Sequence, residues 1–180
     1  MLEITVPGVE LYDESTGSLF TVQGQTITLE HSLLSISKWE SKWHKPFLNN
    51  SGLTLDETID YLKCMTITKN VDPLLYTALT QQNVLEVNNY IEDSMTATTI
   101  REPEGKGKSR RIVTSELIYA WMFALRIPKE CERWHINRLL MLIRVMDIEQ
   151  QPKKKMRKKD VMKQNAALNA ARKRKMNTRG

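Results

Sequence analysis

The stretch TITLEHSLLSISKWESKW, residues 26–43, is where the hydrophobic period of this chain changes. In its first part apolar residues alternate with polar ones, and Ile27 and Leu29 would share one face of a strand that runs to Leu33. In its second part Trp39 and Trp43 are four residues apart, as on one side of a helix. The stretch therefore joins a β-rich segment to a helical one, which predicts an α+β fold class.

The residues before this change read as short antiparallel strands. LEITVP, VELYD, SLFTVQ and TITLEHSLL alternate apolar and polar residues, and the segments ESTGS and QGQ between them carry glycines suited to turns. Strands that follow one another through short turns usually pair in sequence order. We therefore expect residues 1–35 to form an antiparallel β-meander, the β-rich part of the body.

The residues after it read as helices, each with a local start signal. Ser37 with Glu40 and Thr54 with Glu57 both fit the capping box, in which a hydroxyl and a carboxylate satisfy the first amides of a helix. Asp72-Pro73, Asn83 with Glu86, and Ser115 predict three further starts. After Pro128 a single long helix is expected to run to Glu149 as the spine of the body, with much of its circumference buried.

One segment of the helical part departs from this pattern. TATTI and RRIVT are rich in β-branched residues and flank the loop PEGKGKS, so a β-hairpin is expected near residues 96–114. Residues 36–150 would otherwise form the helical part of the same domain as residues 1–35. The body is rich enough in apolar side chains to bury a core of its own.

The last thirty residues have a different composition. Residues 151–180 contain twelve Lys or Arg and one acid, a net charge of +11, whereas the first 150 residues have a net charge of −5. This segment has too few apolar residues to fold alone. The chain therefore reads as a mildly acidic body with a basic C-terminal extension, whose alanine-rich stretch DVMKQNAALNAARKRK can form a separate helix in suitable surroundings.

The sequence lacks the groupings that catalysis or metal binding would require. His31, His44 and His135 are far apart, the two cysteines share no CxxC or Cys/His cluster, and GKGKS lacks the spacing of a phosphate-binding loop. The acidic patch of Asp56, Glu57 and Asp60 is read as a solvated helix face. We predict no catalytic residues, no metal site and no cofactor.

Membrane insertion and export are not expected either. The opening LEITVPGVELYDE is acidic and alternating, unlike a signal peptide, and the longest apolar run, around LLMLI, is too short to cross a bilayer. Free thiols in a reducing compartment are favoured over a disulfide between Cys64 and Cys131.

Two features suggest binding. Trp39 and Trp43, with lysines around them, could form a platform for single-stranded nucleic acid, or a core wedge with lysines at its rim; the second reading is favoured. The basic extension could be a solvated run, a nucleic-acid-binding segment, or an arm that docks on an acidic protein surface. The residues expected to make those contacts are Lys153, Lys154, Lys155, Arg157, Lys158, Lys159, Arg172, Lys173, Arg174 and Lys175. A secondary basic patch at the expected hairpin comprises Lys106, Lys108, Arg110 and Arg111.

Three phrases of the body, LEHSLLSISKWESKWHKPFL, YLKCMTITKNVDP and SELIYAWMFALRIPKECERWHINRLLMLIRV, resemble a family of tailed-bacteriophage proteins. The ending QNAALNAARKRKMNTRG is similar to the basic C-termini of that family. The resemblance implies a non-enzymatic role as a tail assembly chaperone or a minor virion protein. As a chaperone the protein would bind the tape-measure protein in the host cytoplasm, before the tail tube forms.

Two other functions stay open. The chain could be a structural component of the virion, in the head, connector or tail, whose basic arm contacts DNA or an acidic neighbour. It could also be a nucleic-acid-binding protein. Phage tape-measure or tail proteins are the expected partners, and self-association and nucleic-acid contacts through the arm remain alternatives, with no membrane involved.

Overall fold

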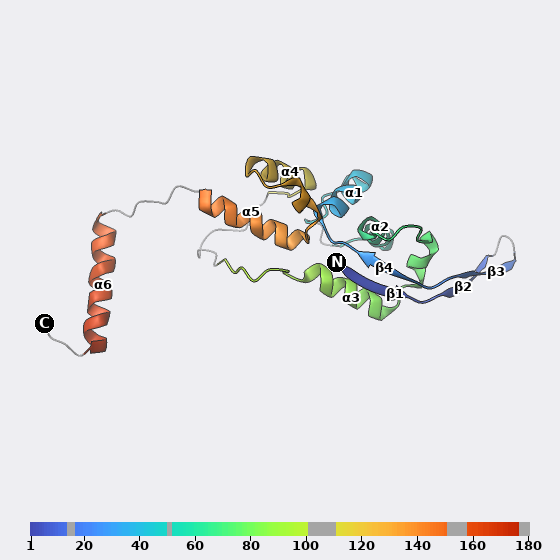
Figure 1. The fold of residues 1–180 in the computed structure, drawn as a ribbon, viewed down its shortest axis with the longest axis horizontal. Coiled ribbons are helices and arrows are strands. Elements are labelled where there is room, and N and C mark those ends of the chain that lie inside the picture. Colours follow the sequence, from blue (N-terminus) through green and yellow to red (C-terminus); the bar gives the residue numbers. More distant parts are fainter. Residues whose placement is uncertain (14–16, 50–51, 101–110, 151–157, 177–180) are drawn as a thin grey trace. The chain divides into compact units, whose positions relative to one another are not determined.

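The computed structural model describes residues 1–13, 17–49, 52–100, 111–150 and 158–176. The chain divides into two compact units, Met1–Asp147 and Ile148–Gly180. The first unit combines N-terminal antiparallel strands with helices, and so confirms the predicted α+β class (Figure 1). The division falls inside the last helix of the body, just before the boundary expected after residue 150.

The strands form one long interrupted hairpin and not the predicted meander. β1 (Leu2–Val6) pairs with β4 (Gln25–Leu29), and β2 (Val9–Asp13) pairs with β3 (Ser18–Val22), all antiparallel. The segments Pro7-Gly8 and Gln23-Gly24 do not reverse the chain. They face each other and interrupt the two ladders, because proline cannot donate a ladder hydrogen bond.

This interruption depends on glycine because the two backbones approach closely. A Cβ on Gly24 would lie 2.7 Å from the amide nitrogen of Gly8 and 2.9 Å from the carbonyl oxygen of Val6. A Cβ on Gly8 would lie 3.0 Å from the nitrogen of Gly24. These neighbours are backbone atoms that cannot move aside without displacing a strand.

Gly24→Ala is therefore expected to lower the free energy of unfolding by about 1.5 kcal/mol, since the added methyl overpacks against the facing backbone. Gly52→Ala is the matched control, because among the described residues, its chain neighbours aside, no atom lies within 4 Å of the position its Cβ would take. Urea unfolding of both variants measures the difference. Equal midpoints for the two variants would show that the close approach is not constrained.

The first helix begins earlier than predicted. α1 (Leu33–Trp43) has Ser32 as its N-cap, and Ser32 and Ser35 form a reciprocal capping box. The predicted start at Ser37 with Glu40 is wrong, and the strand ends at Leu29 and not at Leu33. Beyond Leu29 the backbone leaves its partner strand, and the Glu30 amide donates to the Met65 carbonyl.

The remaining starts follow the sequence to different degrees. α2 (Leu55–Met65) is capped by Thr54 with Glu57, as predicted. Asp72 caps Pro73–Ala78, labelled η1, which is a 3₁₀ helix. α3 (Gln81–Glu92) is capped by Thr80 with Asn83, so its predicted start at Asn83 with Glu86 is wrong. α4 (Ser115–Ala124) has Thr114 as its N-cap, and not Ser115.

The predicted long helix is interrupted. It comprises the 3₁₀ helix η2 (Lys129–Arg133) and α5 (Ile136–Gln150). Between them the backbone pairs with the segment that joins β4 to α1: His135 forms a bridge with Ser32, and the Ile136 amide donates to the His31 carbonyl at 3.0 Å. The apolar spacing of the sequence is compatible with one continuous helix, but this backbone pairing with a distant segment breaks the helix at His135.

The hairpin expected near residues 96–114 is wrong in its described part. Residues 96–100 and 111–114 contain no strand, and residues 101–110 lie outside the described residues. Side chains take the backbone amides that a strand would use. Asp93 accepts from the Met95 amide, Thr96 from the Thr98 amide, and Asn49 from the Val113 amide.

The core lies between the inner face of β1–β4 and the helices. Ile4, Val6, Ile27 and Leu29 fill that face, and Trp39 at the centre of α1 is fully buried. Polar Thr5 and Thr26 lie on the opposite face, where their hydroxyls are hydrogen-bonded at 2.9 Å. The second unit contains α6 (Lys158–Met176), which agrees with the helix foreseen for the extension.

Candidate functional site

α4 is a strongly apolar helix that is only partly buried. Residues 117–125, LIYAWMFAL, contain no charged side chain, and a helix that is apolar on all sides is normally buried. Within α4, however, only Ser115, Ile118 and Met122 are buried. Phe123 is 73% exposed. The helix therefore presents apolar surface that the described residues of the body leave uncovered.

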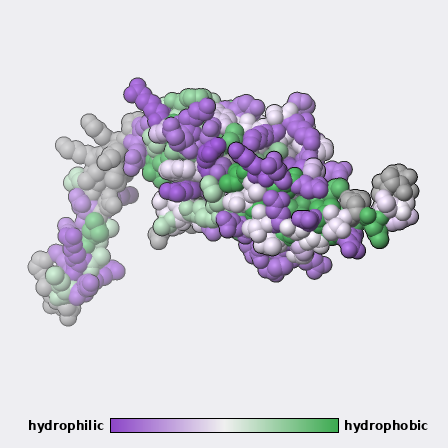
Figure 2. Space-filling model, turned by 45° about the vertical axis from the view of Figure 1, so that its right-hand side comes forward, coloured by the Kyte–Doolittle hydropathy of each residue, from purple (hydrophilic) through white to green (hydrophobic). Residues whose placement is uncertain are grey.

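A groove lies beside this surface, between α4 and α5. Its volume is about 430 Å³. We call it the α4–α5 groove. It is lined by Trp121, Ala124, Leu125, Leu140, Ile143, Arg144 and Asp147. Apolar side chains form most of the lining, and one charge of each sign stands among them. Hydrophobic residues also reach the surface elsewhere on the body (Figure 2).

The sequence of α5 explains its contribution to the groove. Ile136, Leu139 and Ile143 are buried and fix the inward face of the helix. Leu140 and Leu142 are only partly buried, although they pack against the core. The helix is therefore less deeply buried than its apolar composition predicts, and Leu140 contributes its partly exposed surface to the groove.

The basic residues predicted to bind a partner are only partly within the described chain. Arg172, Lys173, Arg174 and Lys175 are exposed in the last turns of α6. Lys158 and Lys159 lie at the start of the same helix. Lys153, Lys154, Lys155 and Arg157 lie outside the described residues.

α6 has no apolar face. All of its side chains that the structure describes are exposed, including Leu168 and Met162. The four consecutive cations at residues 172–175 follow one another at about 100° around the helix axis, so they surround the helix and do not line one side of it. They lie at its C-terminus, where cations stabilise the helix dipole. Such a helix can attract polyanions but cannot by itself offer an apolar docking face.

Of the secondary basic patch, only Arg111 is described. Its guanidinium lies 5.9 Å from the ring centre of Trp121, a residue of the α4–α5 groove. Lys106, Lys108 and Arg110 lie outside the described residues. The structure thus connects Arg111 with the groove, which the sequence did not suggest.

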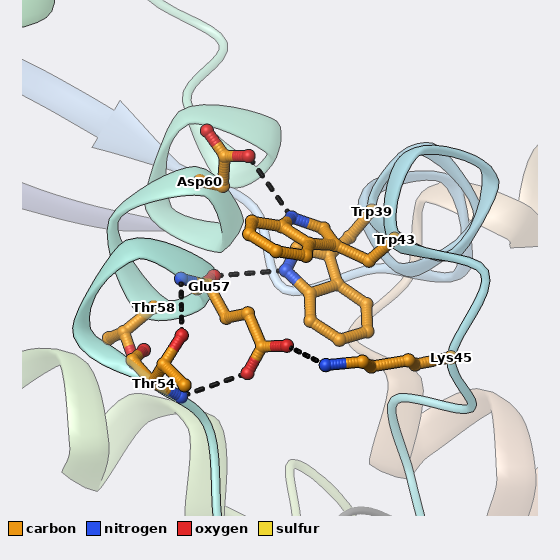
Figure 3. Close-up of polar contacts among 7 residues, drawn as sticks. All are labelled: Trp39, Trp43, Lys45, Thr54, Glu57, Thr58 and Asp60. Carbon is orange, nitrogen blue, oxygen red and sulfur yellow. Dashed lines mark hydrogen bonds and ion pairs between the residues drawn. The ribbon is translucent and has the colours of Figure 1, made fainter.

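The Trp39/Trp43 pair is part of the packing between α1 and α2 (Figure 3). Trp39 is fully buried, and its indole N–H donates to the Glu57 carbonyl at 2.9 Å. Trp43 is partly buried, and its N–H donates to Asp60 at 3.0 Å. The rings stack with centres 6.2 Å apart. The favoured reading as a core wedge is confirmed for Trp39.

Two of the lysines around this pair form ion pairs with the acidic patch of α2. Lys45 forms an ion pair with Glu57 at 2.5 Å, and Lys42 pairs with Asp60. Hydrogen bonds from these lysines lower the pKa of both carboxyls. A base stacking on Trp39 would require α1 and α2 to separate, so this cluster is structural.

Two of the histidines meet although the sequence separates them widely. The rings of His31 and His135 lie 5.0 Å apart. The Tyr61 hydroxyl is hydrogen-bonded to Nδ1 of His31, and Nε2 of His135 donates to the Tyr90 carbonyl at 2.8 Å. Burial, and then the neighbouring His135, lowers the pKa of His31 to about 3. No local signal could have predicted this pair.

The described residues contain no group of three or more His, Cys, Asp or Glu side chains that could hold a metal ion. Burial raises the pKa of the Cys64 and Cys131 thiols, which makes both less nucleophilic. No helix within the described ranges is long and apolar enough to cross a membrane.

Comparisons with known proteins do not place the chain. No family model, no curated protein and no solved structure matches it.

Proposed function

We propose that this chain is a non-enzymatic protein of tailed-phage morphogenesis, acting as a tail assembly chaperone that binds the tape-measure protein. The role comes from the resemblance of its body and its basic ending to that family. The partner would present an amphipathic helix to the α4–α5 groove, and the basic extension would add long-range attraction.

The observation that carries the proposal is the uncovered apolar surface of α4. An apolar patch beside a groove is typical of a protein-binding site. Phe123 and the half-buried Trp121 supply aromatic side chains of the kind enriched at binding hot spots. The groove suits a helix that inserts aliphatic side chains at intervals of three and four residues, as amphipathic segments do.

Phe123→Ser is expected to weaken capture of the tape-measure protein at least tenfold, because an exposed aromatic anchor is removed from the apolar surface of α4. It should change the free energy of unfolding by less than about 0.5 kcal/mol, since the side chain makes little contact with the body. Co-expression of the full-length chain with the tape-measure protein, followed by pull-down and measurement of the soluble fraction, provides the test.

Leu55→Ser is the matched control. Leu55 is 76% exposed on α2, away from the α4–α5 groove, so its loss removes a similar apolar surface without touching the proposed site. Equal capture by wild type and Phe123→Ser, or equal loss in both variants, would count against the apolar surface of α4 as the binding site. A tape-measure protein whose solubility does not depend on this chain would count against the chaperone role itself.

A second candidate is a structural virion protein whose basic arm contacts DNA. The exposed cations of α6 favour it. Exchange of Arg172, Lys173, Arg174 and Lys175 for glutamine is expected to reduce the salt dependence of DNA binding by about three to four units of logarithmic slope. Titration of DNA at several salt concentrations measures this change in slope.

Detection of the chain at fixed stoichiometry in purified virions would favour the structural role, because an assembly chaperone leaves the particle.

A further inference from the structure

The two halves of the N-terminal hairpin differ in how their outer edges are used. In β1–β4 the chain after α2 runs along β4: the Ile67 amide donates to the Thr28 carbonyl at 2.9 Å, and Leu29 bridges Thr66. The outer edge of β1 accepts a hydrogen bond from the Asn83 side chain to the Thr5 carbonyl at 3.2 Å. Both outer edges of this half are thus engaged.

The β2–β3 half, here called the distal ribbon, lacks such cover. Among the described residues no further strand pairs with β2 or β3. Val22 at its base is buried, but Tyr12 and Leu19, a cross-strand pair near the turn, are 62% and 69% exposed. In Figure 1 the ribbon extends past the helices. Val9 and Leu11 also pack against the core, but a ribbon of only two strands gains little stability from its own pairing in water.

The two edges of the distal ribbon are not equivalent. β2 carries Glu10 and Asp13, and charges on an edge strand oppose pairing with another strand. β3 belongs to residues 17–29, GSLFTVQGQTITL, which contain neither a charge nor a proline. Edge strands of natural proteins usually carry a charged residue or a proline that prevents pairing with another chain. The β3 edge is therefore the open one.

We propose that a second copy of this chain occupies the β3 edge, so that two β3 strands pair antiparallel and form a four-stranded sheet in the order β2–β3–β3–β2. A neutral edge can meet itself about a two-fold axis without bringing like charges together, which is not true of β2. The pairing would form hydrogen bonds between backbone amides and carbonyls of the two β3 strands. It would also turn two marginally stable two-stranded ribbons into one four-stranded sheet.

The kink at Gly8 and Gly24 supports this arrangement. It separates the ladder of the distal ribbon from that of β1–β4, whose edges the body already uses. The ribbon can therefore pair with a second molecule without displacing Thr66, Ile67 or Asn83. This surface is also separate from the α4–α5 groove, so the inference does not depend on the proposed function.

The test compares the full-length wild type with the double variant Leu19→Lys/Thr21→Lys. Both side chains are exposed on the same face of β3, so the new charges should leave the fold intact and repel across the two-fold axis. Light scattering over a wide range of protein concentration should show a wild-type dimer, with a dissociation constant at least tenfold larger in the variant. Asn88→Lys/Asn89→Lys, two exposed positions on α3, adds the same charge elsewhere and should leave the dimer unchanged.

Hydrogen exchange of the wild type gives a second measurement that needs no variant. Amides of residues 18–22 should exchange more slowly as the protein concentration rises. A monomer at every concentration would overturn the proposal. So would a dimer that survives the β3 lysines, or one that the α3 lysines dissociate equally.

Discussion

Exchange of Glu40 for glutamine is expected to lower the free energy of unfolding by about 3 kcal/mol, the largest effect of any single substitution proposed for this chain. The carboxylate is buried inside the body, with 7% of the residue exposed. One oxygen accepts from the Phe47 amide at 2.8 Å, and the other accepts from the buried Ser115 amide at 2.7 Å. A single side chain thus joins α1, the segment after it, and the start of α4.

The effect should be large because the N-cap side chain of α4 does not satisfy the Ser115 amide. Its N-cap, Thr114, makes no side-chain hydrogen bond to the helix. Glu40 therefore satisfies an amide at the N-terminus of α4 and complements the helix dipole with a negative charge. The amide group of glutamine could accept from only one of the two backbone donors, and its NH₂ group would face the other. An unsatisfied buried donor costs about 1–3 kcal/mol in addition to the lost charge-assisted bond.

Urea unfolding at neutral pH measures this effect, with an unchanged denaturant slope expected if the native state keeps its compactness. Glu3→Gln is the control, because Glu3 is exposed on the outer face of β1 and its exchange removes the same charge without leaving a buried amide unpaired. A loss of stability below about 1 kcal/mol in Glu40→Gln would contradict the role assigned to the carboxylate.

Glu40 also shows which parts of the fold the sequence could predict. The capping box of Thr54 with Glu57 was read correctly because both partners lie within one turn of the same helix. Glu40 fits the same local pattern with Ser37, but its oxygens bind Phe47 and Ser115, and Ser115 is 75 residues away. A pattern that local spacing allows was overridden by a distant contact.

The interrupted spine has the same cause. The apolar spacing from Cys131 onward is compatible with a single helix, yet the chain opens at His135 to pair with Ser32. The meeting of His31 with His135 depends on that opening, so the sequence could not reveal it. The uncovered surface of α4 was equally hidden, because an apolar helix is normally assigned to the core until its neighbours are known.

The buried histidine pair makes the stability of the body dependent on pH. Burial lowers the pKa of His31 from 6.5 to about 3, and burial also lowers the pKa of His135. The unfolded chain therefore binds protons between about pH 6.5 and pH 3 that the folded chain excludes. Stability is complete above pH 6.5 and is lost as the pH falls through this window. From pH 7.5 to pH 5, His31 alone should lower the free energy of unfolding by about 2 kcal/mol.

The surroundings of the pair support this sign. His31 contacts Tyr61 of α2, Tyr90 of α3 and His135. Burial raises the pKa of both tyrosines, so neither becomes an anion that could stabilise an imidazolium. Asp93 favours the charged form of His135, but burial outweighs it. Hydrogen bonds lower the pKa of the Glu57, Asp60 and Glu116 carboxyls below their ordinary values of 4.5, 3.8 and 4.5, so their contribution to the pH dependence lies mainly below pH 5, outside the range from pH 7.5 to pH 5.

Unfolding by urea at a series of pH values from 7.5 to 5 therefore isolates the histidines. His31→Leu should be less stable than wild type at pH 7.5, since the Tyr61 hydroxyl loses its partner, but its stability should vary less with pH because the group with the most depressed pKa is gone. His44→Asn is the control: His44 is exposed in a left-handed conformation that asparagine tolerates, and its loss should leave the wild-type slope unchanged. If His31→Leu kept the full pH dependence, proton exclusion by this buried pair could not be its source, and the acid sensitivity would have to come from groups at the surface.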